Sequence, residues 1–251
     1  MLIHRTVLIR FALVLGAAYA LILVATAPAT LIGKFLPVQA GIRLERLSGT
    51  LWQGAADTVT LSSPIGLIQV NALSWDMQWR FLLRGEFALR LETADAAGSL
   101  IVARSFGGLR LAQANIALPA VDLAQILPSL ALWQPEGEVQ FQTQGFAPTA
   151  KSSGKANLFW RNARLNLSPQ QTLGDYRLEL QTVNQKLDAR LETLHGSLKL
   201  EGVGSYTQQG GLQFNGSAQA DAAHAAALKN LLNEIGSDRG DGVHQISLRQ
   251  P

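Results

Sequence analysis

Apolar residues follow two different patterns along the chain. Within Phe11–Ala27 they are almost continuous, and with residues 7–9 they form an apolar stretch of about 20 residues, the length of a helix that crosses a bilayer. Further along, every second residue is apolar in segments such as Tyr176–Gln181, Leu187–Glu192 and Leu198–Glu201. That period of two is typical of half-buried strands. The pattern therefore predicts one transmembrane helix followed by a mainly β domain.

Short polar breaks separate the alternating segments, for example Asn184-Gln185, His195-Gly196 and Gln209–Gly211. Such breaks are long enough for hairpins but too short for helical crossovers, so we expect a curved antiparallel β-sheet. Two segments have helical spacing instead. Residues 121–130 carry apolar residues two to four apart, and residues 221–235 are rich in alanine, with their large apolar residues on one face.

These patterns divide the chain into four parts. We expect a cytoplasmic N-terminus at 1–10, a transmembrane helix at 11–32, a periplasmic β domain at 42–235, and a flexible C-terminal tail or final strand at 236–251. The orientation follows from Arg5 and Arg10, which precede the apolar stretch, whereas only Lys34 follows it closely. An excess of positive charge marks the cytoplasmic side of a membrane helix. The sequence thus predicts a single-pass protein of the cell inner membrane of a Gram-negative bacterium.

A cleaved signal peptide is the alternative interpretation of the N-terminal segment. Arg5, the apolar stretch and Ala25-Thr26-Ala27 follow one another as the three regions of a signal peptide do. Against cleavage, the apolar stretch is long, and Pro28 would stand directly after the cut. A proline is better suited to the end of a helix.

A weak internal duplication runs through the β region. Five short matches recur in the same order at an offset of about 100 residues, among them Leu51-Trp52 with Phe159-Trp160 and Gly98-Ser-Leu with Gly196-Ser-Leu. The last match in each half precedes one of the two expected helices. We therefore expect two related β-units, at 42–132 and 138–235.

Composition removes several classes of function. The formal net charge is +3, but beyond the apolar stretch the positive and negative residues nearly balance and are interspersed, so no nucleic-acid partner is expected. The chain has no cysteine, and its four histidines lack the spacing of a metal site. We expect no enzyme activity, catalytic residue, metal or cofactor.

The candidate structural or partner-binding residues are glycines and tryptophans. Gly49 and Gly54 flank Trp52 and allow a strand corner around a buried aromatic anchor. Trp75 and Trp79 are four residues apart, which places them on one face of a strand and in the core. An exposed aromatic row there would instead contact lipid or a partner strand. Trp160 occupies the position matching Trp52 in the second half of the duplication.

Four segments carry a resemblance to a known family: Leu47–Gly54 (LSGTLWQG), Leu73–Trp79 (LSWDMQW), Leu173–Leu180 (LGDYRLEL) and Gly196–Gly202 (GSLKLEG). Together with the single membrane span, their order resembles type II secretion system protein N over nearly the whole chain. The resemblance implies an inner-membrane component of the apparatus that exports folded proteins. It transfers no chemistry to particular residues.

Two functions remain open from the sequence. In the first, the chain is a non-enzymatic secretion component whose periplasmic β domain contacts inner-membrane platform proteins or the outer-membrane secretin, for example by strand addition at a sheet edge. In the second, it is a lipid-binding or lipid-transport protein of the envelope, holding acyl chains in an apolar β-groove.

Overall fold

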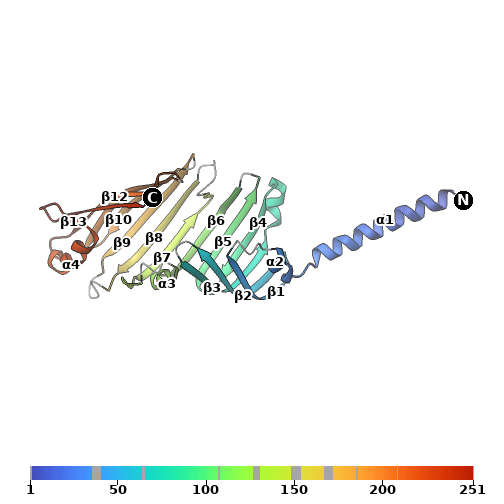
Figure 1. Cartoon of the computed structure of the whole chain (residues 1–251), viewed down its shortest axis with the longest axis horizontal. Coiled ribbons are helices and arrows are strands. Elements are labelled where there is room, and N and C mark those ends of the chain that lie inside the picture. The colour runs from blue at the N-terminus through green and yellow to red at the C-terminus, as the bar shows by residue number, and fades with distance from the viewer. Residues whose placement is uncertain are drawn as a thin grey trace.

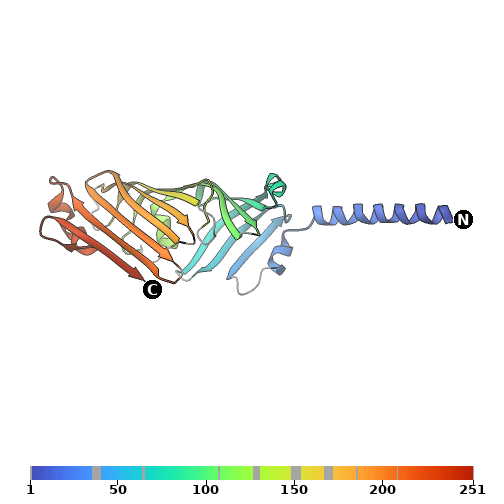
Figure 2. The same cartoon turned by 90° about the horizontal axis from the view of Figure 1, so that it is seen from above.

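A computed structural model of the chain describes residues 2–35, 41–63, 66–106, 108–126, 131–147, 154–166, 172–184, 186–207 and 209–250. One long sheet makes up most of the molecule, and helix α1 (Leu2–Ala25) extends from one end of it (Figures 1 and 2). Three shorter α-helices, α2 (Thr30–Phe35), α3 (Ala120–Ile126) and α4 (Ala225–Ile235), and the 3-10 helix η2 (Trp79–Arg84) accompany the sheet. The mainly β fold expected from the alternating pattern is confirmed.

The sheet is antiparallel and follows the order of the chain. In the described part of the chain it has fourteen strands, with β1 to β12 side by side in sequence order, followed by β14 and then β13. Their bounds are β1 Ile42–Gly49, β2 Gln53–Ser63, β3 Gly66–Met77, β4 Phe87–Thr93, β5 Ala96–Ser105, β6 Gly108–Pro119, β7 Glu136–Thr143, β8 Gly154–Arg164, β9 Gly174–Val183, β10 Lys186–His195, β11 Leu198–Thr207, β12 Gly211–Ala220, β13 Ser237–Asp238 and β14 Val243–Gln250. Residues 236–251, expected to form either a flexible tail or a final strand, thus contain the strand β14.

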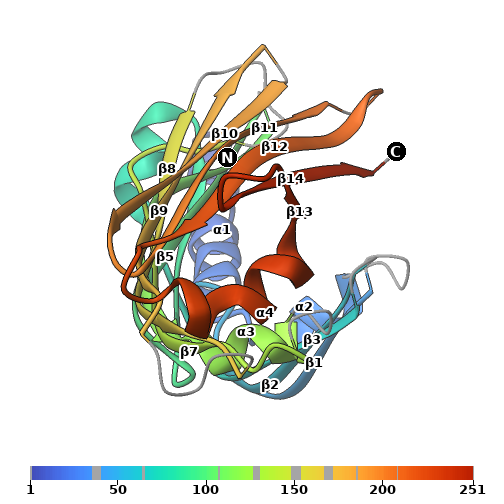
Figure 3. The same ribbon diagram turned by 90° about the vertical axis from the view of Figure 1, so that its left-hand side faces the viewer.

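Seen along its length, the sheet curls into an open trough, and α2, α3 and α4 lie on its inner side (Figure 3). Twisted antiparallel strands curl in this way when one face is apolar and must be covered. The described strands all belong to this one sheet, so the short helices and the strands' own side chains form the core.

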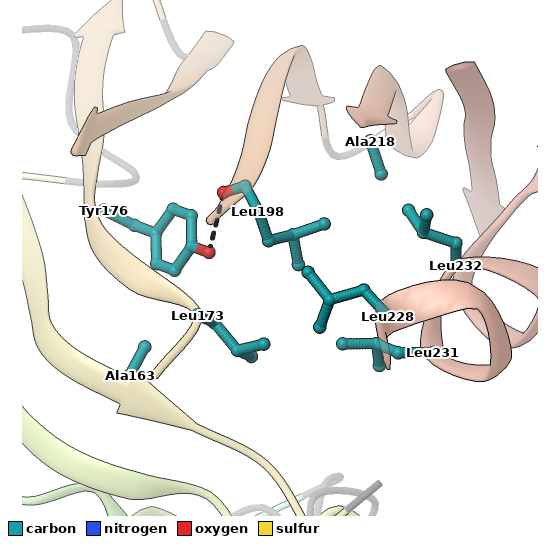
Figure 4. Packing of buried hydrophobic residues seen from close by; sticks show 8 residues of the cluster. All are labelled: Ala163, Leu173, Tyr176, Leu198, Ala218, Leu228, Leu231 and Leu232. Atoms are coloured by element: carbon teal, nitrogen blue, oxygen red, sulfur yellow. Dashed lines mark hydrogen bonds between the residues drawn. The ribbon is translucent and has the colours of Figure 1, made fainter. Parts of the chain in front are cut away.

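The core of the C-terminal half lies between α4 and the sheet. Leu228, Leu231 and Leu232 of α4 are buried and point toward Leu173 and Leu198 from the strands and their connections (Figure 4). These three leucines fall on one helix face at spacings of three and four, as the sequence predicted. The predicted helix is therefore confirmed, although it begins at Ala225 rather than at residue 221, because Asp221 accepts the backbone N–H of His224 in a preceding turn.

Tyr176 shows how this core satisfies a buried polar group. Its side chain is buried beside Leu198, and its hydroxyl donates a hydrogen bond of 2.9 Å to the backbone carbonyl of that residue (Figure 4). Burial raises the pKa of the Tyr176 hydroxyl well above its ordinary value, and the neighbouring Asp175 charge acts in the same direction. The hydroxyl therefore stays neutral and acts as a hydrogen-bond donor.

A second core cluster occupies the N-terminal half. Ala56 and Val59 of β2, Trp75 of β3 and Ala29 are buried together, and Ile32 of α2 packs against them. The helix α2 thus covers part of the apolar inner face near β1, as α4 covers that face at the other end of the sheet. The apolar pattern does not predict α2, because six residues are too few to show a helical period.

One expectation about secondary structure needs correction. Trp75 and Trp79 do not share a strand face, because β3 ends at Met77, whose backbone N–H donates to the carbonyl of Trp52 at 2.7 Å. The chain then turns into η2, leaving Trp79 57% exposed while Trp75 is 6% exposed. The helix expected at 121–130 is confirmed for its described part by α3 (Ala120–Ile126), and residues 127–130 lie outside the described residues.

The N-terminal helix α1 is 24 residues long. Among the residues that the structure describes, no helix meets the length and hydropathy criteria for a membrane span.

The number of strands before an α-helix is the same in the two halves of the sheet, although η2 lies between β3 and β4 in the first half alone of the described chain. Six strands, β1 to β6, precede α3, and six more, β7 to β12, precede α4. The matched tryptophans differ, however, since Trp52 lies in the turn between β1 and β2 whereas Trp160 lies within β8. Parts of the matched segments, including 167–170, fall outside the described residues. The duplication into units at 42–132 and 138–235 stays a prediction.

Candidate functional site

An apolar groove opens on the inner face of the N-terminal half, with a volume of about 470 Å³. Its walls come from β1 to β6, with Ile32 of α2 at one side. The side chains that line it are nearly all apolar and include Ile42, Leu44, Val59, Leu61, Val70, Leu73, Trp75, Leu89, Leu91, Leu100 and Ile116. Few polar groups line the groove, so it is suited to binding an apolar ligand rather than to catalysing a reaction of a polar substrate.

Strand register explains why the groove is continuous across strands. Trp75 of β3 lies opposite Leu91 of β4, and Leu91 lies opposite Leu100 of β5. Directly opposed residues point to the same face of an antiparallel sheet, so each pair extends the apolar wall. The alternation Leu73-x-Trp75 and Leu89-x-Leu91 in the sequence is the local signal of this face.

Gly54 makes room for the largest side chain of the groove, and Gly49 allows the turn beside it. Gly49, Gly54 and Trp75 are register neighbours on β1, β2 and β3. A Cβ atom on Gly54 would lie 2.5 Å from Cζ2 of Trp75, so only glycine leaves space for the indole ring there. Gly49 has a φ of +83°, which lets the chain turn tightly into the next strand. The predicted corner at these glycines is therefore present.

The aromatic anchor of that corner differs from the prediction. Trp75 is the buried residue, whereas Trp52 is only half-buried and lies at the surface end of the turn. The Trp52 ring packs against Trp79 with ring centroids 5.6 Å apart. We call Trp52 and Trp79 the tryptophan pair.

The tryptophan pair connects the sheet to α1. The indole Nε1 of Trp52 donates to the carbonyl of Val24, near the end of α1, at 2.8 Å. The backbone N–H of Leu51 donates to the carbonyl of Ala27 at 2.9 Å, and the N–H of Ala29 donates to the carbonyl of Gly49 at 3.0 Å. Three hydrogen bonds therefore fix the segment that leaves α1 against the turn between β1 and β2.

Replacing Trp52 by phenylalanine is expected to loosen this connection. The ring contact with Trp79 is largely kept, but the donor to Val24 is lost, at a cost of about 1 kcal/mol. Hydrogen exchange followed by mass spectrometry should show faster exchange in residues 24–33 and little change elsewhere. Trp160→Phe is the matched control, because it removes an indole bond of 3.0 Å to the Glu136 carbonyl far along the chain. Equal exchange in both variants at 24–33 would contradict the assignment.

Trp160 does not belong to the corner. It lies on β8 and packs partly against the C-terminal core, with its ring 6.0 Å from that of Tyr176. Of the six residues singled out in the sequence, the structure thus brings together Gly49, Trp52, Gly54, Trp75 and Trp79. The groove itself was missed because its members come from six strands, and only their register makes them neighbours.

The described residues hold no group of three or more histidines, aspartates or glutamates placed to bind a metal ion. His224 lies 2.6 Å from Asp221, and this hydrogen bond is the largest cause of the lowered pKa of Asp221. The contact belongs to the turn before α4. His195 and Asp175, 3.2 Å apart, form a second such contact near the end of β10.

Comparisons with known proteins define the class. The family model for protein N of the type II secretion system matches residues 40–247. The type II secretion system protein N of Pectobacterium carotovorum subsp. carotovorum is 26% identical to this chain over 245 residues, and the match covers 92% of each protein. None of the solved structures matches the chain significantly.

The chain therefore belongs to the type II secretion system protein N family. Membership of this family supports a role as a component of the secretion apparatus. The family is not known to have enzyme activity. The resemblance inferred from the four sequence segments is confirmed.

Proposed function

We propose that α1 anchors the chain in the bacterial inner membrane, with the N-terminus in the cytoplasm and the β domain in the periplasm. Nine large side chains of the described part of α1 are each more than half exposed: Phe11, Leu13, Val14, Leu15, Tyr19, Leu21, Ile22, Leu23 and Val24. A continuous apolar surface of this kind is stabilised by an apolar surrounding. Arg5 and Arg10 precede it in the sequence, which supports the proposed orientation.

In this role the β domain contacts other proteins of the secretion apparatus through the sheet edge at β14. The observation that carries the proposal is the incomplete pairing of this edge. On its outer side β14 pairs with β13 only at His244 and Gln245, and no other described strand continues the pairing toward Gln250. Unpaired N–H and C=O groups of an edge strand bind an extended segment of another protein by strand addition.

A photocrosslinking amino acid at Leu248 tests the edge in living cells. Leu248 lies on β14 and is 56% exposed, so we expect it to crosslink to another secretion component. Val203 is equally exposed at 56% but lies on β11, between two paired strands, and serves as the matched control. Equal crosslinking from both positions, or none from Leu248, would count against contact through β14.

A strain lacking the protein tests the function as a whole. We expect a secreted enzyme to accumulate in the periplasm while the outer membrane stays impermeable to detergents and large antibiotics. Normal secretion together with a leaky outer membrane would reject the secretion role and favour the second candidate.

That second candidate is lipid binding, and the apolar groove favours it. The groove has a volume of about 470 Å³ and is lined almost wholly by aliphatic side chains and the indole of Trp75. Such a groove is suited to an acyl chain. In the C-terminal half, Leu228, Leu231 and Leu232 of α4 cover the corresponding face of the sheet. The apolar inner face of the sheet is therefore covered less completely at the groove than it is beneath α4.

Phospholipids that carry a photoreactive diazirine in the acyl chain distinguish the two candidates when the full chain is reconstituted in vesicles. Lipid binding predicts labelled peptides from β2 to β4 in addition to α1. Leu73→Gln should remove the label from the groove and leave that of α1, whereas Leu132→Gln, at an exposed turn position, should change neither. Label confined to α1 would reject binding in the groove.

A further inference from the structure

The helix η2 exposes an unusual amount of apolar surface for so short a segment. Of its six residues, Trp79 is 57%, Leu82 45% and Leu83 91% exposed, and none is buried. Phe87, at the start of β4, is 42% exposed. We call these four residues the apolar rim. Large apolar side chains exposed within nine consecutive residues are typical of a contact surface.

The local structure holds these side chains outward. Phe81 packs against the small core of Ala88, Ile101 and Ala103, which fixes one side of η2 to the sheet. Gly85 ends the turn with a φ of +69°, and its N–H donates to the carbonyl of Leu82 at 2.9 Å. The exposure of the apolar rim is thus a consequence of fixed backbone geometry.

The apolar rim lies beside the end of α1. Trp79 packs on Trp52, whose indole is bonded to the carbonyl of Val24. In Figures 1 and 2, η2 is the turquoise coil at the end of the sheet nearest α1. A bilayer around α1 would therefore have its surface close to this end of the domain.

Both charged residues within η2 are arginines. Arg80 and Arg84 of η2 are both exposed, and no salt bridge joins either to a carboxylate of the described residues. The Arg80 guanidinium lies 5.5 Å from the centre of the Phe81 ring. Glu86, the nearest acid in sequence, already accepts two hydrogen bonds from Arg110, of 3.2 Å and 2.7 Å, which keep the pKa of Glu86 below its ordinary value, and the charge of Arg84 contributes to this lowering. Two exposed guanidinium groups without a salt bridge, beside tryptophan and leucine, are complementary to lipid phosphates above acyl chains.

We propose that the apolar rim lies in the headgroup layer of the membrane that α1 enters, with Arg80 and Arg84 binding phosphates of anionic lipids. The inference rests on the proposed membrane anchor and adds a second contact to it. Tryptophan is favoured at this depth because its ring is apolar and its N–H is polar, and arginine extends its charge toward the phosphates. Together with the hydrogen bonds at Val24, this contact fixes the tilt of the β domain relative to the bilayer.

The chain has no cysteine, so single cysteines can report position without background labelling. The full chain is reconstituted in vesicles of equimolar phosphatidylcholine and phosphatidylglycerol, with an environment-sensitive fluorophore on Leu83→Cys. Leu132→Cys is the matched control, because Leu132 is 86% exposed but lies in the turn before β7. Ala17→Cys reports the position of α1. Each label is exposed in turn to lipids spin-labelled near the headgroup and to aqueous iodide.

We expect the Leu83 label to be quenched by the spin-labelled lipid and protected from iodide, and the Leu132 label to behave in the opposite way. Replacing Arg80 and Arg84 by glutamine should weaken the quenching at Leu83 in anionic vesicles, by about fivefold in contact equilibrium per arginine, and should have little effect in pure phosphatidylcholine.

The outcomes separate the inference from the anchor. If the Ala17 label is buried in the bilayer but the Leu83 label is quenched only by iodide, the anchor holds and the inference is wrong. If neither label meets lipid, both the anchor and the inference fail. Protection of Leu83 from iodide without quenching by lipid would assign the apolar rim to a protein contact and would also overturn the inference.

Discussion

Replacing Leu228 by alanine is expected to lower the free energy of unfolding by about 3 kcal/mol, within the range of leucine truncations in protein cores. Leu228 is fully buried between α4 and the sheet, and its neighbours Leu173 and Leu198 belong to segments held by strand pairing. The strands cannot collapse around the lost atoms without breaking their register. The truncation therefore leaves a cavity and frees α4 from the trough.

Urea denaturation of the full chain in detergent, followed by tryptophan fluorescence, measures this loss. Leu132→Ala removes the same atoms from a side chain that is 86% exposed and should change the free energy by less than about 0.5 kcal/mol. Hydrogen exchange should increase in β11, β12 and α4 and stay unchanged in β1 to β6, because among the described residues the core clusters of the two ends share no member. A uniform increase along the sheet would show that the ends are coupled after all.

Replacing Gly54 by alanine is expected to destabilise the N-terminal half by about 1–3 kcal/mol, the usual cost of adding atoms to a filled site. The new Cβ would lie 2.5 Å from both the Trp75 ring and the Ser48 carbonyl. The backbone cannot move far, because Gly54 is paired on both sides, so the indole has to leave its place. Its bond to the Leu51 carbonyl, 3.3 Å long, would be lost as well.

Tryptophan emission reports the displacement of Trp75, and we expect a red shift with the loss of stability. Gly33→Ala is the matched control, because the nearest side-chain atom to its new Cβ is 4.0 Å away, in ordinary contact. If Gly54→Ala keeps both the emission and the stability of the unmodified chain, then Trp75 does not depend on the space above Gly54.

Much of this fold could be predicted from local patterns. Alternation identified strands such as β9, β10 and β11, and the leucine spacing identified α4, because each pattern lies within one element. The pattern failed at Trp79, since Trp75, Met77 and Trp79 have strand spacing but the strand ends between the second and the third. The end of the strand is set by hydrogen bonds from the Met77 N–H to the Trp52 carbonyl and from the Gln78 N–H to the Ala88 carbonyl. Trp52 and Ala88 lie outside the segment that has strand spacing.

The candidate site was only partly accessible to sequence reasoning. Gly49 and Gly54 were recognisable because glycines within a strand-like sequence often mark a bulge or a tight bend. The role of Trp52 as a link to α1 was not, because a hydrogen bond to Val24 joins residues 28 positions apart. For the same reason, the groove became visible only when the register placed Leu91 between Trp75 and Leu100.

The sequential order of the strands has a consequence for how the chain folds. Each strand from β2 to β12 finds its first partner immediately before it in the chain, so the sheet can grow by one hairpin at a time. Pairings between sequence neighbours involve short loops and low contact order, which favours rapid folding. A chain that emerges gradually from the N-terminal end can therefore begin to assemble its sheet before synthesis ends, with the newest strand always serving as the template for the next.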